Sequence, residues 1–248
     1  MSSNTLKVLI TRPADRGQKL TQQLQALGIT VTSQALFDYQ NNSSQASLQQ
    51  RLTNQPNAMI IFVSVAAVTH ANATWPIAHW ACKALFAVGS ATQAALQALT
   101  KQSIICPNQH NSEGLLALPQ LTQVRKQDII IVRGDGGREY LAQQLKHRGA
   151  NVSYIESYQR IWRTFSNNIA KQWQARQINC IVITSNALLE RVIHLSKHTN
   201  KNWRDNCLWI VASKRIAEHA KQLGLTKIIN ANGANDQAIL KALMTATE

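Results

Sequence analysis

Acidic residues are scarce in this sequence. It holds 12 Asp and Glu against 26 Lys and Arg in 248 residues, a formal net charge of +14 at pH 7. A surplus of this size raises the local concentration of anions and speeds their encounter with the surface. We therefore expect an anionic ligand, although a solvated basic surface explains the charge equally well.

Dense basic runs are missing as well. The nearest clusters are Lys146-His147-Arg148 and Lys214-Arg215, and the six tryptophans are not interleaved with Lys and Arg. Binding to single-stranded nucleic acid uses a basic groove with stacking aromatic side chains. The sequence therefore favours a small anion over nucleic acid as the partner.

Long hydrophobic runs are also lacking. The longest extends from Ala58 to Val68 and is interrupted by Ser64, whereas a membrane helix needs about 20 apolar residues. Met1-Ser2-Ser3-Asn4-Thr5 has no basic region typical of a signal peptide. We expect a soluble, cytoplasmic protein that does not contact a membrane.

Cysteine is rare, and the four residues (Cys82, Cys106, Cys180 and Cys207) form no Cys-x-x-Cys pair. Structural zinc sites and redox-active thiols usually carry such pairs, and a chain of this length does not depend on disulfides. We predict four reduced, buried thiols.

Two further motifs are too incomplete to define a metal or dinucleotide site. His194 and His198 have i, i+4 spacing, but no third ligand or accompanying glutamate is evident, so we expect no metal. Gly134-Asp135-Gly136-Gly137 lacks the Gly-x-Gly-x-x-Gly spacing of a dinucleotide loop, and Glu156 is the nearest candidate for its acidic residue. An NAD-dependent enzyme therefore stays only a distant alternative.

What the sequence does contain is an internal repeat. Val8-Leu9-Ile10-Thr11-Arg12 matches Ile129-Ile130-Ile131-Val132-Arg133 at an offset of 121 residues, since 129 minus 8 is 121. Ile60–Ser64 matches Ile181–Ser185 at the same offset. With two or three inserted residues, Leu85–Ser90 also matches Leu208–Ser213. The repeat indicates two copies of one supersecondary unit.

Each copy has the pattern of a β-α-β unit. Apolar β-branched runs alternate with amphipathic helices, and Gly28 and Gly149 stand where helix-ending glycines are expected. The apolar runs are continuous, as in parallel strands covered on both faces. The sequence predicts an α/β chain of two similar doubly wound, parallel-sheet halves.

Ligands of such sheets bind at the carboxyl ends of the strands, where helix N-termini present backbone N–H groups. Small, hydroxylated or basic residues predominate at these ends: Thr11, Arg12, Ser64, Gly89, Ser90, Arg133, Gly134, Thr184, Ser185, Ala212 and Ser213. This lining suits carboxylates or phosphates. For any single Ser or Thr, helix capping, which contributes about 1 kcal/mol, is the better explanation.

Several of these segments together resemble the uroporphyrinogen-III synthases. The resemblance rests on landmarks whose order and spacing extend over nearly the whole chain: Thr11-Arg12-Pro13, Gly28, Ser64 with Ala67-Val68, Ala87-Val88-Gly89 with Thr92, Ser112–Leu116, Arg133-Gly134, Arg138-Glu139, Leu145, Gly149, Tyr158, Thr184-Ser185, and Ser213 with Ile216-Ala217. The family often has Thr-Ser at both strand ends, whereas the first copy here has Val63-Ser64. A role for a threonine hydroxyl at that position is therefore not expected.

The resemblance implies two α/β domains joined by two extended connectors, with the chain crossing over twice. The first domain would comprise residues 1–35 and 166–248, the second residues 39–160, and the connectors residues 36–39 and 156–165. The repeat alone would place one boundary near Gln123 to Gln127. Two slender connectors would also allow the domains to close and open around a substrate.

The resemblance also implies an activity. The family cyclises hydroxymethylbilane, a linear tetrapyrrole with eight carboxylates, with loss of water and inversion of the last ring through a spiro intermediate. It is a hydro-lyase reaction that needs no cofactor. The expected partner is this small molecule rather than nucleic acid or membrane, and the family implies a monomer that could contact hydroxymethylbilane synthase transiently.

Carried onto this sequence, the resemblance predicts one catalytic residue and a set of anion anchors. Tyr158 would protonate or hydrogen-bond the departing hydroxyl, unless it is only a packed connector residue. The predicted substrate-binding residues are Arg12, Ser64, Thr92, Arg133, Arg138, Thr184, Ser185, Ser213 and Lys214. Arginine suits bidentate carboxylate contacts, but a structural ion pair explains Arg12 and Arg133 about equally well.

The main alternative from another class is a two-domain binding module that closes around an anionic small molecule. A basic nucleic-acid binder and an NAD-dependent enzyme follow. Micromolar, sequence-independent binding to DNA would favour the nucleic-acid binder. A shift of the melting temperature by a nicotinamide cofactor would favour the NAD-dependent enzyme.

Overall fold

A computed structural model describes residues 6–136, 139–197, 199 and 201–246. The chain divides into two compact units: unit 1 (residues 1–38 and 161–248) and unit 2 (residues 39–160). It passes between them twice, through β3 (Phe37–Asn41) and β8 (Asn151–Trp162). The predicted α/β class with two parallel-sheet domains and a double crossing is confirmed.

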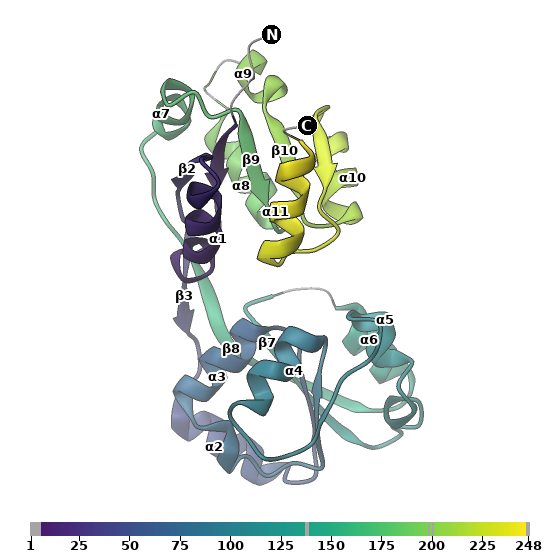
Figure 1. The fold of residues 1–248 in the computed structure, drawn as a ribbon. Coiled ribbons are helices and arrows are strands. Elements are labelled where there is room, and N and C mark those ends of the chain that lie inside the picture. Colours follow the sequence, from purple (N-terminus) through teal and green to yellow (C-terminus); the bar gives the residue numbers. More distant parts are fainter. Residues whose placement is uncertain (1–5, 137–138, 198, 200, 247–248) are drawn as a thin grey trace. The chain divides into compact units, whose positions relative to one another are not determined.

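Unit 1 is built on a five-stranded parallel sheet (Figure 1). Its strands, in spatial order, are β11 (Ile228–Asn230), β10 (Leu208–Val211), β9 (Cys180–Ile183), β1 (Lys7–Ile10) and β2 (Thr30–Ser33). The central strands β1 and β9 are almost wholly buried. Continuous apolar strands of this kind need helices on both faces.

Helices α1 (Ala14–Ala26) and α11 (Asp236–Thr245) contact each other and cover one face of this sheet. Leu20 and Leu24, one helical turn apart, pack there with Ile239 and Val8. The other strand residues, such as Leu9, are equally buried and point to the opposite face. The remaining helices of unit 1 are α7 (Ile169–Ala175), α8 (Asn186–Leu195), α9 (Lys201–Asn206) and α10 (Lys214–Gln222).

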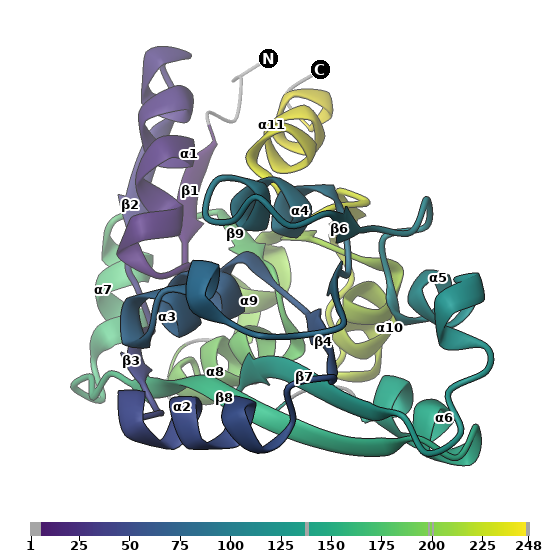
Figure 2. The same cartoon turned by 90° about the horizontal axis from the view of Figure 1, so that it is seen from below.

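Unit 2 contains a six-stranded sheet. Its strands, in spatial order, are β3, β8, β7 (Asp128–Gly134), β4 (Met59–Phe62), β5 (Ala84–Ala87) and β6 (Ile104–Ile105). Figure 2 shows the long strand β8 beside β7. All pairs from β8 to β6 are parallel.

The edge strand β3 departs from the predicted parallel arrangement. The Asn42 N–H donates to the Ser157 carbonyl at 3.2 Å, and the Arg163 N–H donates to the Leu36 carbonyl at 2.9 Å. The partner numbers fall as the residue numbers of β3 rise, so the two strands are antiparallel. The reason is topological, because β3 carries the chain from unit 1 into unit 2 and β8 carries it back.

Two apolar cores cover the faces of the unit 2 sheet. On one face, α2 (Gln45–Asn54), α3 (Val65–Thr74), α4 (Ser90–Gln97) and the 3-10 helix η1 (Ile77–His79) pack on alternate strand residues such as Ile60. On the other, α5 (Ser112–Leu116), η2 (Pro119–Leu121) and α6 (Tyr140–His147) pack around Ile61. The residues of β4 thus point alternately into the two cores.

The two copies of the repeat are distributed over both units. Strand β1 corresponds to β7 in the repeat, and β4 corresponds to β9. Yet β1 pairs with β9 in unit 1, and β7 pairs with β4 in unit 2. Each sheet therefore joins strands from both copies, and residues 123–127 lie inside the continuous segment of unit 2.

Among the described residues, none of the helices has the length and apolar character that crossing a membrane would require.

Candidate active site

The predicted strand-end residues gather at one edge within each unit, because the strands that carry them are parallel. In unit 1, Ile10 is level with Val182, and Val211 with Ile183, which brings Arg12, Ser185 and Ser213 to the same edge. In unit 2, Phe62 is level with both Ala87 and Val132. Ser64 and Ser90 follow β4 and β5, and Arg133 is the second-last residue of β7.

Three serine hydroxyls cap the helices that begin at these edges. Ser64 accepts a hydrogen bond from the Ala67 N–H at 3.1 Å, Ser185 from the Leu188 N–H at 3.2 Å, and Ser213 from the Ile216 N–H at 3.4 Å. A hydroxyl that accepts such a bond still has its own hydrogen to donate. Capping and anion binding are therefore compatible at these positions.

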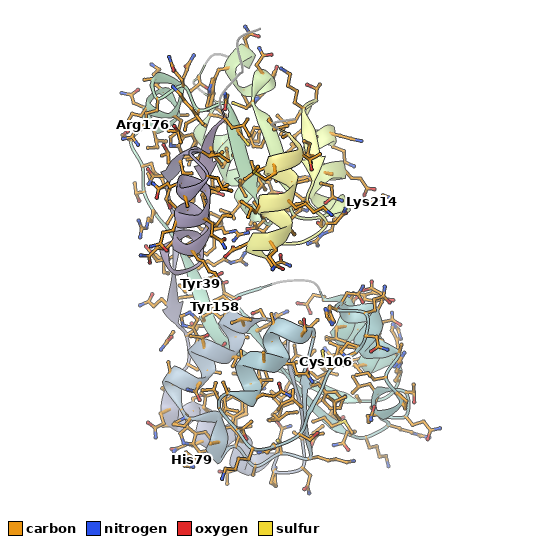
Figure 3. All side chains as sticks on the ribbon, viewed as in Figure 1. Tyr39, His79, Cys106, Tyr158, Arg176 and Lys214 are labelled. Carbon is orange, nitrogen blue, oxygen red and sulfur yellow. The ribbon has the colours of Figure 1, made fainter. Side chains whose placement is uncertain are left out.

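Two threonines and a lysine complete this part of the predicted set. Thr184 lies half-buried between β9 and α8, and Lys214, labelled in Figure 3, is the exposed first residue of α10. Thr92 is only 4% exposed inside α4. Lys214 is thus open to an anion in this conformation, whereas Thr92 is covered.

Arg12 is held by an ion pair within unit 1. It is 5% exposed, and its Nη1 lies 2.6 Å from Asp236 Oδ1 at the first turn of α11. Its Nη2 donates to the Ala234 carbonyl at 2.7 Å. A buried guanidinium needs such partners, since an unpaired buried charge is strongly unfavourable.

Arg133 occupies the equivalent position in unit 2 and is also paired. It contacts Glu139 and, at 3.2 Å, Glu156, and its guanidinium carbon lies 3.6 Å from the centre of the Tyr154 ring. The Nε atom is buried without a hydrogen-bond partner in the described part of the chain. Arg133 therefore has one buried N–H donor without a partner among the described residues.

The groups around Arg133 influence each other's pKa values. Hydrogen bonds from Tyr154 and Arg133 lower the pKa of Glu139. Burial, together with the bond to Glu139, raises the pKa of Tyr154 to about 12. Near neutral pH the cluster therefore contains a carboxylate at Glu139 and a neutral phenol at Tyr154.

A small cavity adjoins this cluster at the strand ends of unit 2. Its volume is about 270 Å³. It is lined by Arg133 and Tyr154 together with apolar and small residues: Val63, Val88, Asn111, Ser112, Ile131, Gly136 and Leu141. An apolar recess with a guanidinium in its wall suits an aliphatic side chain that ends in a carboxylate.

Tyr158 belongs to β8 and lies close to the end of β7. A methyl group placed on Gly134 would come within 2.5 Å of the Tyr158 ring carbons Cε2 and Cζ, so only glycine permits this approach. The Tyr39 ring meets the Tyr158 ring edge-on at 4.8 Å, and the His70 ring lies 5.2 Å away. Figure 3 shows the two labelled tyrosines next to each other.

Two residues singled out in the sequence lie outside the part of the chain that the structure describes. Arg138 and His198 are not among the described residues. No group of three or more His, Cys, Asp or Glu suited to a metal occurs in the part of the chain that is described.

The partners of the predicted residues have no signal in the sequence that marks them as such: Tyr39, His70, Glu139, Tyr154 and Asp236. Tyr39 and Glu139 fall within segments that the resemblance covers, but no spacing connects them with Tyr158 or Arg133. Only the tertiary pairing brings them together.

Comparison with known proteins by sequence identifies the family. A family model described as "Uroporphyrinogen-III synthase HemD" matches residues 7–241. Uroporphyrinogen-III synthase of Salmonella typhimurium is 34% identical over 249 residues, which covers 96% of this chain and 100% of that protein. The Escherichia coli enzyme is 31% identical with the same coverage.

Two solved structures share the fold. A mutant uroporphyrinogen III synthase of Thermus thermophilus matches with a TM-score of 0.64 and 14% identity, over 97% of this chain and 98% of that one. The Helicobacter pylori enzyme matches with a TM-score of 0.62 and 13% identity, over 97% and 99%. With the sequence relatives matched over their full length, the chain belongs to the uroporphyrinogen-III synthase family.

Proposed function

We propose that the chain cyclises hydroxymethylbilane to uroporphyrinogen III, with loss of water and inversion of ring D through a spiro intermediate. As a member of its family, it is a lyase of tetrapyrrole biosynthesis. The observation that carries the proposal is 34% identity over the whole length of the Salmonella typhimurium uroporphyrinogen-III synthase.

In this reaction the protein mainly has to control the conformation of the substrate. Loss of the terminal hydroxyl gives an azafulvene, stabilised as a cation by the pyrrole nitrogen. The far ring then attacks through its substituted carbon, and the spiro intermediate fragments and recloses with that ring reversed. Since the substrate also cyclises spontaneously to the wrong isomer, the enzyme has to impose a folded conformation and assist the departing hydroxyl.

We assign that assistance to Tyr158. Its phenol would donate a proton to the hydroxyl oxygen as the carbon–oxygen bond breaks, so that water leaves. The phenolate would recover a proton from the other, previously unsubstituted ring carbon, which forms the new bond on reclosure and loses its hydrogen when that ring becomes aromatic again. The close approach of Tyr158 to Gly134, at a strand end, supports this assignment.

Each unit offers donors for substrate carboxylates at its own strand-end edge. Lys214 is exposed, and the capping hydroxyls of Ser64, Ser185 and Ser213 each have a hydrogen to donate. The Arg133 Nε donor and the adjoining cavity would hold one acidic side chain of a pyrrole. Arg12, already bound to Asp236, would contribute mainly its positive charge.

We propose a cytoplasmic monomer that works without a cofactor and contacts hydroxymethylbilane synthase transiently. The four cysteines are free thiols; Cys180 and Cys207 are buried as predicted, but Cys82 and Cys106 are only partly buried. Free thiols suit a reducing compartment. Light scattering after size-exclusion chromatography should give the mass of one chain, and a dimer mass would contradict the monomer.

The direct test supplies freshly generated hydroxymethylbilane, oxidises the products and separates the type I and type III uroporphyrin isomers by chromatography. We expect predominantly type III without any added cofactor. Only type I from an enzyme shown to be folded would overturn the proposal.

Tyr158→Phe tests the assigned role of the phenol. We expect kcat to fall about 100-fold, as is typical when a general acid is lost, with KM nearly unchanged. An unchanged kcat would assign the proton donor to water instead.

A further inference from the structure

Tyr158 contacts aromatic side chains from two other elements of unit 2. Tyr39 on β3 meets it edge-on at 4.8 Å, and His70 on α3 lies 5.2 Å away at an interplanar angle of 38°. Tyr39 and His70 also contact each other at 5.4 Å. Three rings in mutual contact at these separations restrict one another's positions.

The orientation of His70 is fixed by a hydrogen bond. Its Nδ1 lies 2.6 Å from the Asn41 Oδ1 atom at the end of β3. An amide oxygen accepts only, so the proton of this bond belongs to Nδ1. The bond prevents the imidazole from rotating freely, and the ring keeps its contact with Tyr158.

The backbone of His70 is also held in place. Ser64 caps the helix that carries His70, and the Thr74 hydroxyl donates to the His70 carbonyl at 3.0 Å. The same helix packs on β7, the strand that ends at Gly134. The imidazole therefore sits on a rigid element beside the strand end where Tyr158 lies.

We infer that His70, oriented by Asn41, is a positioning residue that holds the Tyr158 phenol in its reactive place. The inference rests on the proposed function, and in particular on Tyr158 as proton donor. His70 itself contacts Tyr158 and is assigned no contact with substrate. Its contribution to the rate should therefore exist only while the Tyr158 hydroxyl is present.

A double-mutant cycle measures this dependence. We expect His70→Ala to lower kcat about tenfold in the wild-type background, with KM changed less than about twofold. In the Tyr158→Phe background the same substitution should change kcat less than about twofold. Equal effects in both backgrounds, or no effect in either, would show that His70 does not act through Tyr158.

Asn41→Ala provides a second variant that keeps the helix and the imidazole intact. It should lower kcat about threefold in the wild-type background and leave Tyr158→Phe unaffected. An equal loss in both backgrounds would overturn the inference. His79→Ala, an exposed histidine of η1 labelled in Figure 3, is the matched control and should behave like the wild type.

The outcomes separate this inference from the proposed function. If the wild type produces only type I isomer, the proposed function fails whatever the variants do. If it produces type III and Tyr158→Phe keeps the full rate, the function stands and the positioning role of His70 is wrong.

Discussion

Arg12 and Arg133 illustrate how residues at equivalent positions in the two copies acquire different surroundings. Arg12 pairs with Asp236 of α11 and with a backbone carbonyl. Arg133 pairs with Glu139 and Glu156 and stacks on Tyr154. Both guanidiniums are bound to carboxylates, so both form ion pairs within the fold. Of the two, only Arg133 has a buried N–H group without a hydrogen-bond partner in the part of the chain that the structure describes.

Gly134 leaves the space that the Tyr158 ring occupies. Gly134→Ala would place a methyl group 2.5 Å from two carbons of the Tyr158 ring and force the ring to move. We expect kcat to fall at least about tenfold, because a small misplacement of a reacting group is costly.

The matched control for Gly134→Ala is Gly17→Ala, where the nearest atom would lie 3.5 Å from the new methyl group. Because alanine favours helix, this variant should be as stable as the wild type or up to about 1 kcal/mol more stable, with unchanged kcat. Steady-state kinetics and urea unfolding check both variants. A Gly134→Ala enzyme with normal kcat would contradict the assigned position of Tyr158.

Glu139 should make the stability of unit 2 sensitive to acid. Its pKa is lowered from the ordinary value of 4.5 by hydrogen bonds from Tyr154 and Arg133. A carboxyl group with a depressed pKa in the folded state stabilises the fold above about pH 4.5, and this stabilisation is lost as the pH falls through the folded pKa. Glu139→Gln should therefore be less stable than the wild type at pH 7, with the difference vanishing at lower pH.

The size of that difference is limited, because the Glu139 side chain is 49% exposed. We expect less than about 1 kcal/mol from urea unfolding at a series of pH values. Glu218→Gln, which alters an exposed carboxylate in unit 1, serves as the control. A difference that grows as the pH falls would contradict the assigned ion pair.

At the scale of elements, a capping serine recurs where a strand leads into a helix. Strand β4 ends before Ser64, β9 before Ser185 and β10 before Ser213, and each serine caps the following helix. Strand β5 ends before Gly89, which has no side chain to offer as a cap. The small polar residues noted in the sequence are thus explained in part by capping, and their contact with substrate stays a prediction.

Two substitutions of Ser213 separate capping from anion binding. Ser213→Ala removes the cap of α10 and should destabilise the protein by about 1 kcal/mol. Ser213→Asp keeps a capping oxygen and should preserve stability, because aspartate is favoured at this position.

The aspartate would nevertheless repel a carboxylate of the substrate, so we expect KM to rise in Ser213→Asp while the melting temperature stays constant. Thermal unfolding and initial-rate kinetics provide both values. An unchanged KM would show that Ser213 only caps the helix. Ser44→Asp, at the cap of α2, is the control that should leave KM as it is.

The elements themselves were largely predictable. The continuous apolar runs at residues 8–10, 60–62 and 181–183 fall on β1, β4 and β9, because strands buried on both faces must be apolar throughout. Gly28 and Gly149 follow α1 and α6 with φ of +75° and +82°, a conformation that favours glycine. The antiparallel edge strand β3 was not predicted, since its direction depends on where the chain returns.

At the scale of the molecule, the net charge of +14 should affect the encounter with the proposed substrate and its eight carboxylates. We expect kcat/KM to fall several-fold between about 0.02 M and 0.5 M sodium chloride, because salt screens attraction beyond a few ångströms. The rate constant kcat should change little, since it describes the bound state.

Sucrose at matched viscosity controls for slower diffusion in this salt series. If kcat/KM is independent of salt, the positive charge is a general property of the surface and has no role in capturing substrate.

The sequence by itself determined the class of elements, the duplication and the family. These follow from local patterns, since burial on both faces requires continuous apolar strands and a duplicated unit leaves a fixed offset. Tertiary structure decided which copies share a sheet, with β1 beside β9 and β7 beside β4. It also decided which side chains meet, such as His70 with Tyr158 and Arg12 with Asp236, because those contacts join residues 88 and 224 positions apart. No local pattern encodes pairings over such separations, since they arise only when the strands and helices pack.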